Sequence, residues 1–209
     1  MIQFKQFTGG DLETHAYLLK APEGNILFDA PFGADEHFAS ERVDLLLLTH
    51  GHFDHIANAA RIRRRHKCPV GIHPDSAPML AQQDFFKKWG FFVEIESLQP
   101  DLLLEESSCT NFLGLNLQIF LVPGHCPGSL CFLTQPDQQA DACLFGGDVL
   151  FRGGVGRWDL PGGNREILLE GIRHKLLTLP DKIPVYPGHG PSTTIGFEKR
   201  TNPFLVDLN

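Results

Sequence analysis

Short apolar runs separated by turn residues recur along the chain, and they predict strands. Three of them open the sequence, divided by glycine- and proline-containing turns, and they are residues 2 to 7, 15 to 20 and 25 to 28. Leu45 to Leu48 form an uninterrupted apolar run bounded by charge, which is typical of a strand buried on both faces. Later strands are predicted over residues 110 to 122, 130 to 134, 142 to 145 and 183 to 186.

Apolar residues at helical spacing predict two helices between these strands. The first extends from Ile56 through Ile62 to the basic run Arg63-Arg64-Arg65. This run is interpreted as the solvated end of the helix, where cations offset the helix dipole, rather than as a nucleic-acid patch. The second begins after Asn164, a good N-cap, and its apolar positions are Leu168, Ile172, Leu176 and Leu179. The tail from Phe197 to Asn209 is expected to be short, interrupted by Pro203.

Composition narrows the class of protein. The 209 residues fit one α/β domain, residues 1–209, and the 42% hydrophobic content is ordinary for a soluble protein. A net charge of −7 and a pI near 5.8 oppose binding to nucleic acid or to an anionic membrane. The start of the chain lacks the features of a signal peptide, and the five cysteines form no CxxC pair. We therefore expect a cytoplasmic protein with reduced thiols.

The candidate chemistry begins in the segment Thr49-His50-Gly51-His52-Phe53-Asp54-His55. It follows the buried strand and precedes the first helix, so it lies on a strand-to-helix loop. Three imidazoles and a carboxylate in six residues would each need a buried hydrogen-bond partner if they only packed there. As metal ligands they need no such partners, and the loop can turn them toward one point. The pattern therefore predicts a metal site.

Three further candidates follow later strands. They are His125 after Pro123-Gly124, Asp148 after Gly146-Gly147, and His189 after Pro187-Gly188. In an open α/β sheet the ends of the strands form the edge where ligands collect. One cleft can therefore gather all seven side chains.

These motifs together resemble those of the metallo-β-lactamase-fold hydrolases. The segment from Gly147 to Phe151, continued by Gly156 to Gly163, resembles the glyoxalase II-like (hydroxyacylglutathione hydrolase-like) branch. The resemblance covers essentially the whole chain and implies a four-layer αβ/βα sandwich, with two mixed sheets flanked by helices. It implies a first metal held by His50, His52 and His125, a second held by Asp54, His55 and His189, and Asp148 as the bridge. The metals are expected to be two divalent ions, zinc first, with iron or manganese as alternatives.

The same resemblance implies a reaction. A metal-bridging hydroxide would attack a thioester such as S-lactoylglutathione and release a hydroxy acid and a thiol. Asp54 and Asp148 are the catalytic candidates, with Asp54 orienting the hydroxide, and Arg157 is assigned to a substrate carboxylate. The alternative for Arg157 is a structural salt bridge, with Asp159 as its partner. Asp29 matches an aspartate that family members carry behind the metal loop, which implies that it holds the ligand loops in place through hydrogen bonds. The alternative for Asp29 is a simple turn residue before Pro31.

Other readings remain open. About twenty residues follow His189, fewer than in glyoxalase II proper with its helical C-terminal domain, which makes glutathione doubtful as the carrier thiol. A mononuclear iron persulfide dioxygenase would use His50, His125 and Asp148, and a lactone or ester hydrolase would use the same dinuclear site. Asp148 and His55 argue against β-lactamase activity, because β-lactamases of this superfamily usually have a cysteine at the position of Asp148, and many have another residue at the position of His55. A non-catalytic module is disfavoured because no ligand is missing.

Three details of the sequence carry weaker expectations. Cys126, beside His125, is interpreted as an inert neighbour rather than a redox modulator. Five histidines are expected to be structural, and they are His15, His37, His66, His73 and His174. Most of an aromatic-rich stretch is expected in the core with some members near substrate, and its residues are Met79, Leu80, Phe85, Phe86, Trp89, Phe91 and Phe92.

Overall fold

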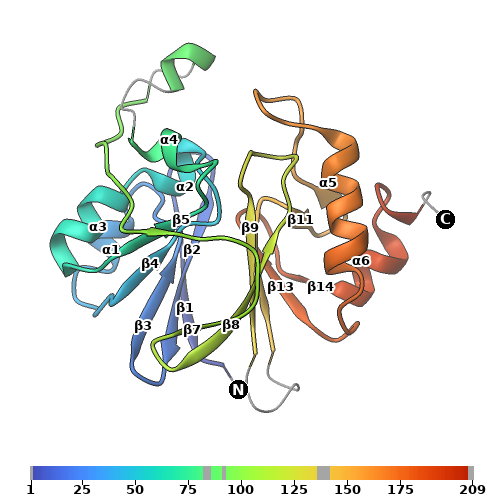
Figure 1. The fold of residues 1–209 in the computed structure, drawn as a ribbon, viewed down its shortest axis with the longest axis horizontal. Coiled ribbons are helices and arrows are strands. Elements are labelled where there is room, and N and C mark those ends of the chain that lie inside the picture. Colours follow the sequence, from blue (N-terminus) through green and yellow to red (C-terminus); the bar gives the residue numbers. More distant parts are fainter. Residues whose placement is uncertain (1, 82–85, 91–92, 136–141, 207–209) are drawn as a thin grey trace.

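Two six-stranded mixed sheets pack face to face, and helices cover the outer side of each (Figure 1). The computed structural model describes residues 2–81, 86–90, 93–135 and 142–206. The first half of the chain builds one sheet with its helices, and the second half builds the other (Figure 1). The order of layers is helix, sheet, sheet, helix. The predicted α/β sandwich with two mixed sheets is therefore confirmed.

The first sheet follows the sequence order β1-β2-β3-β4-β5-β6. Its strands are β1 (Phe4–Gly9), β2 (Thr14–Ala21), β3 (Gly24–Phe28), β4 (Leu45–Leu47), β5 (Val70–Ile72) and β6 (Leu102–Leu103). The first three form an antiparallel meander, as the glycine-rich turns predict, and the next three run parallel to β3.

The second sheet has the order β14-β13-β10-β9-β8-β7. Its strands are β7 (Ser107–Phe112), β8 (Leu115–Leu121), β9 (Leu130–Thr134), β10 (Leu144–Gly147), β13 (Pro184–Pro187) and β14 (Thr193–Thr194). Only β10 and β13 pair in parallel within the described part of this sheet. A separate small hairpin joins β11 (Leu150–Phe151) to β12 (Gly154–Val155).

The helices are short and lie on the outer faces. On the side of the first sheet lie α1 (Ala34–His37), α2 (Phe53–Ile56), α3 (Ala59–His66) and α4 (Ala77–Ala81), and the 3₁₀ turn η1 (Phe86–Trp89) projects beyond α4 (Figure 1). Against the second lie α5 (Arg165–Gly171), continued by the π-helical turn η3 (Ile172–Leu176), and α6 (Ile195–Thr201). The predicted cap of α5 is present, because Asn164 Oδ1 accepts from the amide of Ile167 at 3.0 Å.

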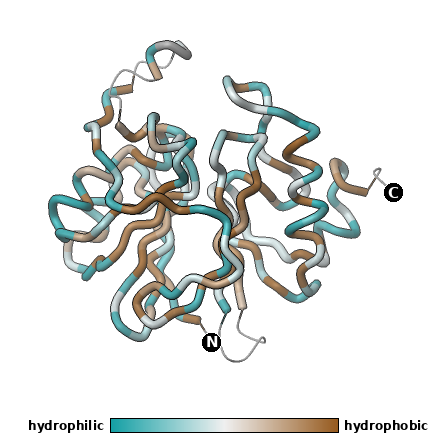
Figure 2. Tube along the Cα trace, in the orientation of Figure 1, coloured by the Kyte–Doolittle hydropathy of each residue, from teal (hydrophilic) through white to brown (hydrophobic). Residues whose placement is uncertain are grey.

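Alternate residues of the inner strands serve two different cores. In the segment that includes β4, Leu45 and Leu47 pack between the two sheets, whereas Leu46 and Leu48 pack under the helices of the first sheet. This explains the uninterrupted apolar run, since a strand covered on both faces has no polar side. In Figure 2 the inner strands are mostly brown, whereas the outer helices alternate between teal and brown.

Three local expectations need correction. The strand predicted over residues 110 to 122 is two strands, because Leu113 and Gly114 adopt positive φ of 52° and 77° and form a tight hairpin turn. The first predicted helix is divided between Ile56 and Ala59, where Asn58 Oδ1 accepts from the amide of Gly33 at 2.7 Å.

The expected C-terminal tail contains the helix α6. Thr194 caps this helix by accepting from the amide of Phe197 at 3.2 Å. The helix ends before Pro203, whose ring cannot continue it, so only the last residues form the tail.

Two arginines of the basic run at the end of α3 are paired on the surface. Arg63 forms two hydrogen bonds with Asp101, and Arg64 pairs with Glu96. Both arginines are exposed. These contacts agree with a solvated helix end.

Candidate metal centre

The segment after β4 adopts the strand-to-helix loop that the sequence predicts. His50 and His52 lie on the loop, His52 precedes the first residue of α2, and Asp54 and His55 occupy its first turn. All four side chains are buried.

Asp29 holds this loop from the end of β3. Its Oδ1 accepts from the amide of Thr49 at 2.8 Å, and its Oδ2 accepts from Thr49 Oγ1 and His55 Nδ1, each at 2.8 Å. The hydroxyl of Thr49, having donated to Asp29, accepts from His50 Nδ1 at 3.0 Å. One buried carboxylate thus orients two of the candidate ligands, which is the supporting role that the resemblance implies for Asp29.

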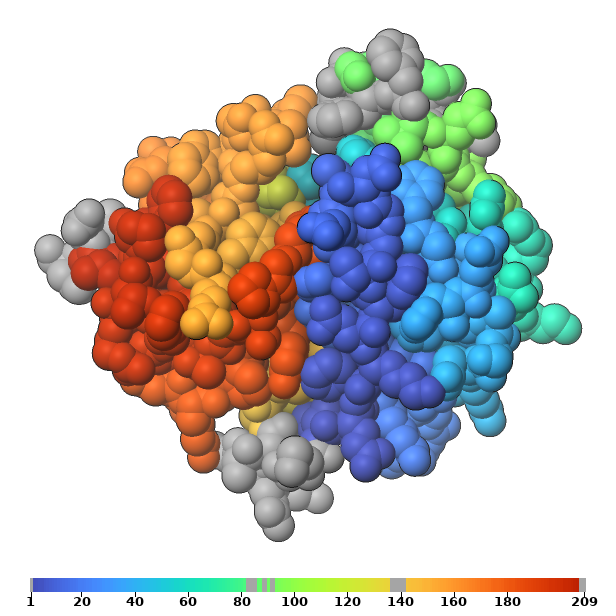
Figure 3. All heavy atoms as spheres, turned by 180° about the vertical axis from the view of Figure 1, so that it is seen from behind, coloured from blue at the N-terminus to red at the C-terminus, as the bar shows by residue number. Residues whose placement is uncertain are grey.

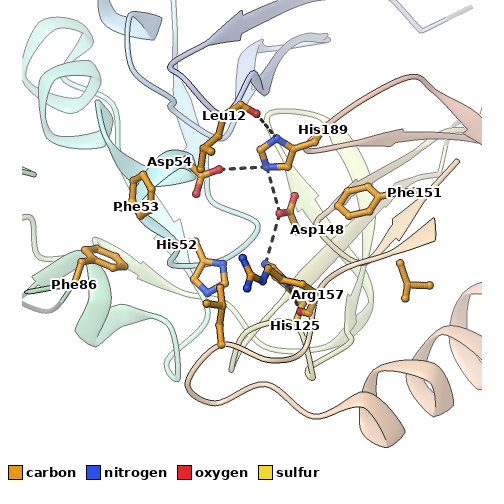
Figure 4. Close-up of a pocket in the computed structure, with 12 residues that line it drawn as sticks. Leu12, His52, Phe53, Asp54, Phe86, His125, Asp148, Phe151, Arg157 and His189 are labelled. Atoms are coloured by element: carbon orange, nitrogen blue, oxygen red, sulfur yellow. Dashed lines mark hydrogen bonds and ion pairs between the residues drawn. The ribbon is translucent and has the colours of Figure 1, made fainter. Parts of the chain in front are cut away.

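The other three candidates come from the second half of the chain and meet this loop (Figure 4). His125 lies between β8 and β9, Asp148 directly follows β10, and His189 lies just past β13. The structure therefore brings all seven predicted side chains to the ends of the strands, at one place between the two sheets.

Their ligand atoms form overlapping groups. Those of each group lie within 4.8 Å of one another, and the groups are His50, His52 and His125; His50, His55 and Asp148; and Asp54, His55 and His189. Across the cluster the Nε2 atoms of His50 and His125 are 3.3 Å apart, and those of His55 and His189 are 3.4 Å apart. The first and third groups coincide with the two predicted ligand sets.

Asp148 faces both sets. Its Oδ1 lies 3.2 Å from His55 Nε2, and its Oδ2 lies 3.5 Å from His125 Nε2 and 3.3 Å from His189 Nε2. A single carboxylate is therefore in reach of both groups, as a bridging ligand has to be.

Hydrogen bonds made by Nδ1 of two candidate histidines show which ring nitrogen faces the cluster. His125 Nδ1 donates to the carbonyl of Arg157 at 2.8 Å, and His189 Nδ1 donates to the carbonyl of Leu12 at 2.9 Å. A carbonyl oxygen only accepts, so Nδ1 carries a proton and Nε2 is the atom left to coordinate. Imidazole nitrogens and carboxylate oxygens aimed at one another at such distances repel unless positive charge lies between them. The donor set therefore fits divalent cations.

The pKa shifts of the histidines also fit a bound cation. Burial, followed by the neighbouring imidazoles, lowers the pKa of His50 well below its usual range and that of His52 to about 3, so these rings stay neutral. Burial also opposes charge on His55 and His189. Even so, the carboxylates of Asp148 and Asp54 raise the pKa of His55 well above its usual range and that of His189 to about 10. This half of the cluster favours positive charge, which a cation supplies in place of protons.

A cavity of about 540 Å³ opens over the cluster. Its lining consists of Leu12, His52, Phe53, Asp54, Phe86, His125, Asp148, Phe151, Val155, Arg157, Leu160 and His189. Phe86 belongs to the aromatic-rich stretch, so one of its members borders the cavity, whereas Met79 and Leu80 are buried. Phe85, Phe91, Phe92 and the side chain of Trp89 lie outside the residues that the structure describes.

Arg157 lies at this cavity with its guanidinium already paired. Its Nε and Nη2 atoms each lie 2.8 Å from an oxygen of Asp159. Both side chains are exposed, by 59% and 63%. The salt bridge that the sequence left open as an alternative is therefore present, and the carbonyl of Arg157 additionally orients His125.

Cys126 and the histidines expected to be structural lie outside the ligand groups found among the described residues. Cys126 is fully buried, with its Sγ atom 3.8 Å from Met79 Sδ. Burial raises the pKa of its thiol to about 12, so the reactive thiolate is scarce at neutral pH. These facts favour the inert neighbour.

The N-terminal hairpin of β1 and β2 contributes contacts that the sequence did not reveal. It lies against the C-terminal part of the chain, as the dark blue and red residues in Figure 3 show. The amide of His15 donates to the carbonyl of Gly188 at 2.7 Å, and Tyr17 Oη donates to the carbonyl of Pro187 at 2.7 Å. Together with the Leu12 carbonyl, this hairpin fixes the loop that carries His189.

Thr14 is the side chain in this hairpin that acts on a candidate catalytic group. It is fully buried, and its Oγ1 donates to Asp54 Oδ2 at 2.7 Å.

Replacing Thr14 by valine keeps the shape of the side chain and removes the hydrogen-bond donor to Asp54. We expect kcat to fall roughly tenfold, because loss of a partner that orients a metal ligand has effects on this scale. Steady-state kinetics test this, with Thr14→Ser as the control that retains the hydroxyl. Equal kcat for the valine and wild-type proteins would show that Asp54 needs no such partner.

Glu198 in α6 is a second residue that the sequence did not single out. It is completely buried, and its carboxylate accepts from the amide of Gly153 at 2.9 Å and from Asn202 Nδ2 at 2.8 Å. These bonds hold the β11–β12 hairpin, whose Phe151 and Val155 line the cavity. The helix missing from the sequence prediction therefore shapes one wall of the site.

In the described part of the chain, no helix is both long and apolar enough to cross a lipid bilayer.

Comparisons with known proteins agree with this geometry. Residues 9–189 match the model of the metallo-beta-lactamase superfamily. The Bacillus subtilis protein named Probable metallo-hydrolase YqgX is 34% identical over 98% of both chains. Hydroxyacylglutathione hydrolase GloC of Haemophilus influenzae is 38% identical over 79% of both chains.

Two solved structures share the fold over nearly their whole length. The structure of the B3 metallo-beta-lactamase BLEG-1 superposes with a TM-score of 0.87 at 35% identity, covering 97% of this chain and 99% of that one. The di-iron-bound form of TTHA1623 superposes with a TM-score of 0.83 at 36% identity, covering 96% of this chain and all of that one. On this evidence, the chain belongs to the metallo-beta-lactamase superfamily.

Proposed function

We propose that this metal-dependent hydrolase cleaves a thioester, such as S-lactoylglutathione, into a hydroxy acid and a thiol. The observation that carries the proposal is the position of Asp148, whose carboxylate is in reach of both ligand groups beneath a largely apolar cavity. The named activity of the Haemophilus influenzae relative supports a thioester as substrate.

Seven side chains would hold two divalent ions, and we propose His50, His52 and His125 for one, Asp54, His55 and His189 for the other, and Asp148 between them. When bound, such ions polarise the carbonyl of the substrate and make water nucleophilic at neutral pH. We assign zinc first. The di-iron form of TTHA1623 supports iron equally, and manganese suits the same donor set.

The residues of the chain supply orientation and shelter. Asp54, fixed by Thr14, would accept a hydrogen bond from the attacking water and hold it toward the carbonyl. The apolar wall formed by Leu12, Phe53, Phe86 and Phe151 limits access of other water to the cavity. The thiolate product leaves readily, so no protonating group is needed beside it. Arg157 is the group that a substrate carboxylate would reach.

A second candidate activity is β-lactam hydrolysis. It is favoured by the similarity to BLEG-1, whose name describes a B3 metallo-beta-lactamase. Against it stands the presence of Asp148 and His55, since a β-lactamase of this superfamily usually has other residues at these positions. A persulfide dioxygenase using one iron with His50, His125 and Asp148 is the oxidative alternative, and it too is compatible with an iron-binding neighbour.

One set of measurements separates these activities. Metal content is determined on protein purified without chelator, and the same sample is assayed with S-lactoylglutathione, a chromogenic cephalosporin, and glutathione persulfide with oxygen monitoring. We expect about two metals per chain and thioester turnover, lost with chelator and restored by metal. One iron per chain with oxygen uptake and no thioester turnover would establish the dioxygenase instead, and turnover of only the cephalosporin would establish the lactamase.

A further inference from the structure

The charges around the cavity show what kind of substrate it suits. Of the twelve described residues that line it, six are apolar and Arg157 is the one lysine or arginine. Apart from the metal centre, a substrate carboxylate that enters the cavity therefore has one basic side chain as a partner among these twelve residues.

A neighbouring cavity of about 460 Å³ extends the cleft on the other side of Asp54. It shares Leu12, Phe53 and Asp54 with the first, and its remaining lining is Gly10, Asp11, Phe32 and Val93. Its described lining contains no lysine or arginine. A thioester has an acyl arm and a thiol arm on either side of the reacting carbonyl, and the two cavities offer space for both arms.

Among the described residues that line the cleft, Arg157 supplies the one guanidinium, and this group is paired with Asp159. The paired atoms are Nε and Nη2, which form the side-on edge of the guanidinium that also binds a substrate carboxylate through two parallel hydrogen bonds. The hydrogen bonds with Arg157 lower the pKa of Asp159 to about 2, so Asp159 stays ionised throughout the neutral range.

The backbone between the two residues is anchored. The ring of Trp158 packs edge-on against Phe204 at 5.9 Å, and the guanidinium of Arg165 lies 5.5 Å from the Trp158 ring centre. The side chains of Arg157 and Asp159, by contrast, are both exposed at the cavity rim. The backbone thus keeps the two side chains next to each other, and because both are exposed to solvent, such a pair can exchange partners.

We infer that Asp159 is a specificity-determining residue, an internal competitor for Arg157 that raises the KM of thioesters bearing a carboxylate, S-lactoylglutathione among them, relative to thioesters with uncharged, apolar arms. The inference rests on the proposed thioester hydrolysis. A carboxylate-bearing substrate has to displace Asp159 before it can bind Arg157, whereas an uncharged substrate relies on the apolar walls and does not.

The test compares Asp159→Asn with wild type on two thioesters that share one acyl group. One is the glutathione thioester, which carries carboxylates, and the other is the N-acetylcysteamine thioester, which carries none. For the glutathione thioester we expect KM to fall by roughly three- to tenfold with kcat unchanged. For the uncharged thioester both constants should stay at their wild-type values.

The control for the change in net charge is Asp181→Asn. Asp181 also pairs with an arginine on the surface, Arg200. It lies before the start of β13, at the opposite end of that strand from His189 and the metal centre. This variant should leave KM and kcat unchanged for both thioesters.

The double variant Asp159→Asn with Arg157→Gln should lose the lower KM for the glutathione thioester, because the guanidinium that Asp159→Asn frees is then absent.

Binding of S-hexylglutathione, a thioether that cannot be hydrolysed, gives a readout independent of turnover. Tighter binding to Asp159→Asn than to wild type supports the inference even if the wild type cleaves no thioester, and that result would overturn only the proposed function. Thioester turnover with an unchanged ratio of the two KM values would overturn the inference alone. A higher KM for the glutathione thioester in Asp159→Asn would also overturn it, because Asp159 would then be a support for Arg157.

Discussion

Replacing Asp148 by alanine is expected to lower turnover by more than about 100-fold and to reduce the metal content of the protein. Loss of a partner that merely orients a metal ligand costs about 10- to 100-fold in affinity or activity, and Asp148 touches both ligand groups itself. Without its carboxylate, the imidazoles of His55, His125 and His189 face one another with less negative charge between them, which weakens the hold on cations.

Metal analysis and steady-state kinetics on the same sample check this result. Asp148→Asn is the matched variant, because it keeps the shape and removes the charge, and it should retain more metal than alanine but little activity. Asp181→Asn controls for loss of a surface carboxylate and should behave as wild type. Full activity of Asp148→Ala with wild-type metal content would refute the bridging assignment.

Replacing Asp29 by alanine is expected to destabilise the protein by on the order of 3 kcal/mol and to weaken metal binding, because it leaves buried donors without their acceptor. The amide and hydroxyl of Thr49 and the Nδ1 atom of His55 all donate to this carboxylate. The backbone adds to the effect. Asp29 has a φ of 60°, a conformation that aspartate and asparagine tolerate better than alanine does.

Urea unfolding with and without bound metal measures both parts of this prediction. Asp29→Asn keeps the backbone preference and one side-chain oxygen, so it should lose less stability than Asp29→Ala while still weakening metal binding. If alanine and asparagine cost the same, backbone preference and the retained acceptor contribute nothing. If neither variant affects metal binding, the carboxylate does not orient the ligand loop.

The two predictions concern residues that differ in how readily the sequence reveals them. Asp148 follows Gly146-Gly147 at the end of an apolar run, and its neighbourhood resembles a family motif, so its place in the cluster could be anticipated. Asp29 has a weaker signal, a lone aspartate before Pro31, and a simple turn explained it equally well. Its three hydrogen bonds depend on the tertiary structure, because they form only where the loop after β4 lies beside the end of β3.

What the sequence determined by itself is local. Apolar runs and helical spacing predicted most strands, the cap of α5, the basic end of α3 and the strand-to-helix loop. The ligands could be predicted because each follows a strand in a recognisable motif. The need for glycine at position 188, by contrast, is explained only by a tertiary contact, since a Cβ atom there would lie 2.2 Å from Asp148 Oδ1.

Only the tertiary structure decided which partners complete the site. Thr14 and Asp54 are 40 positions apart, and Leu12 and His189 are 177 apart, so no local pattern links them. Arg157 and Asp159 are close in sequence, but two exposed charges can pair with each other or with solvent, and spacing alone does not choose. These contacts depend on how two sheets and their loops pack against each other, and that packing brings distant residues within hydrogen-bond distance.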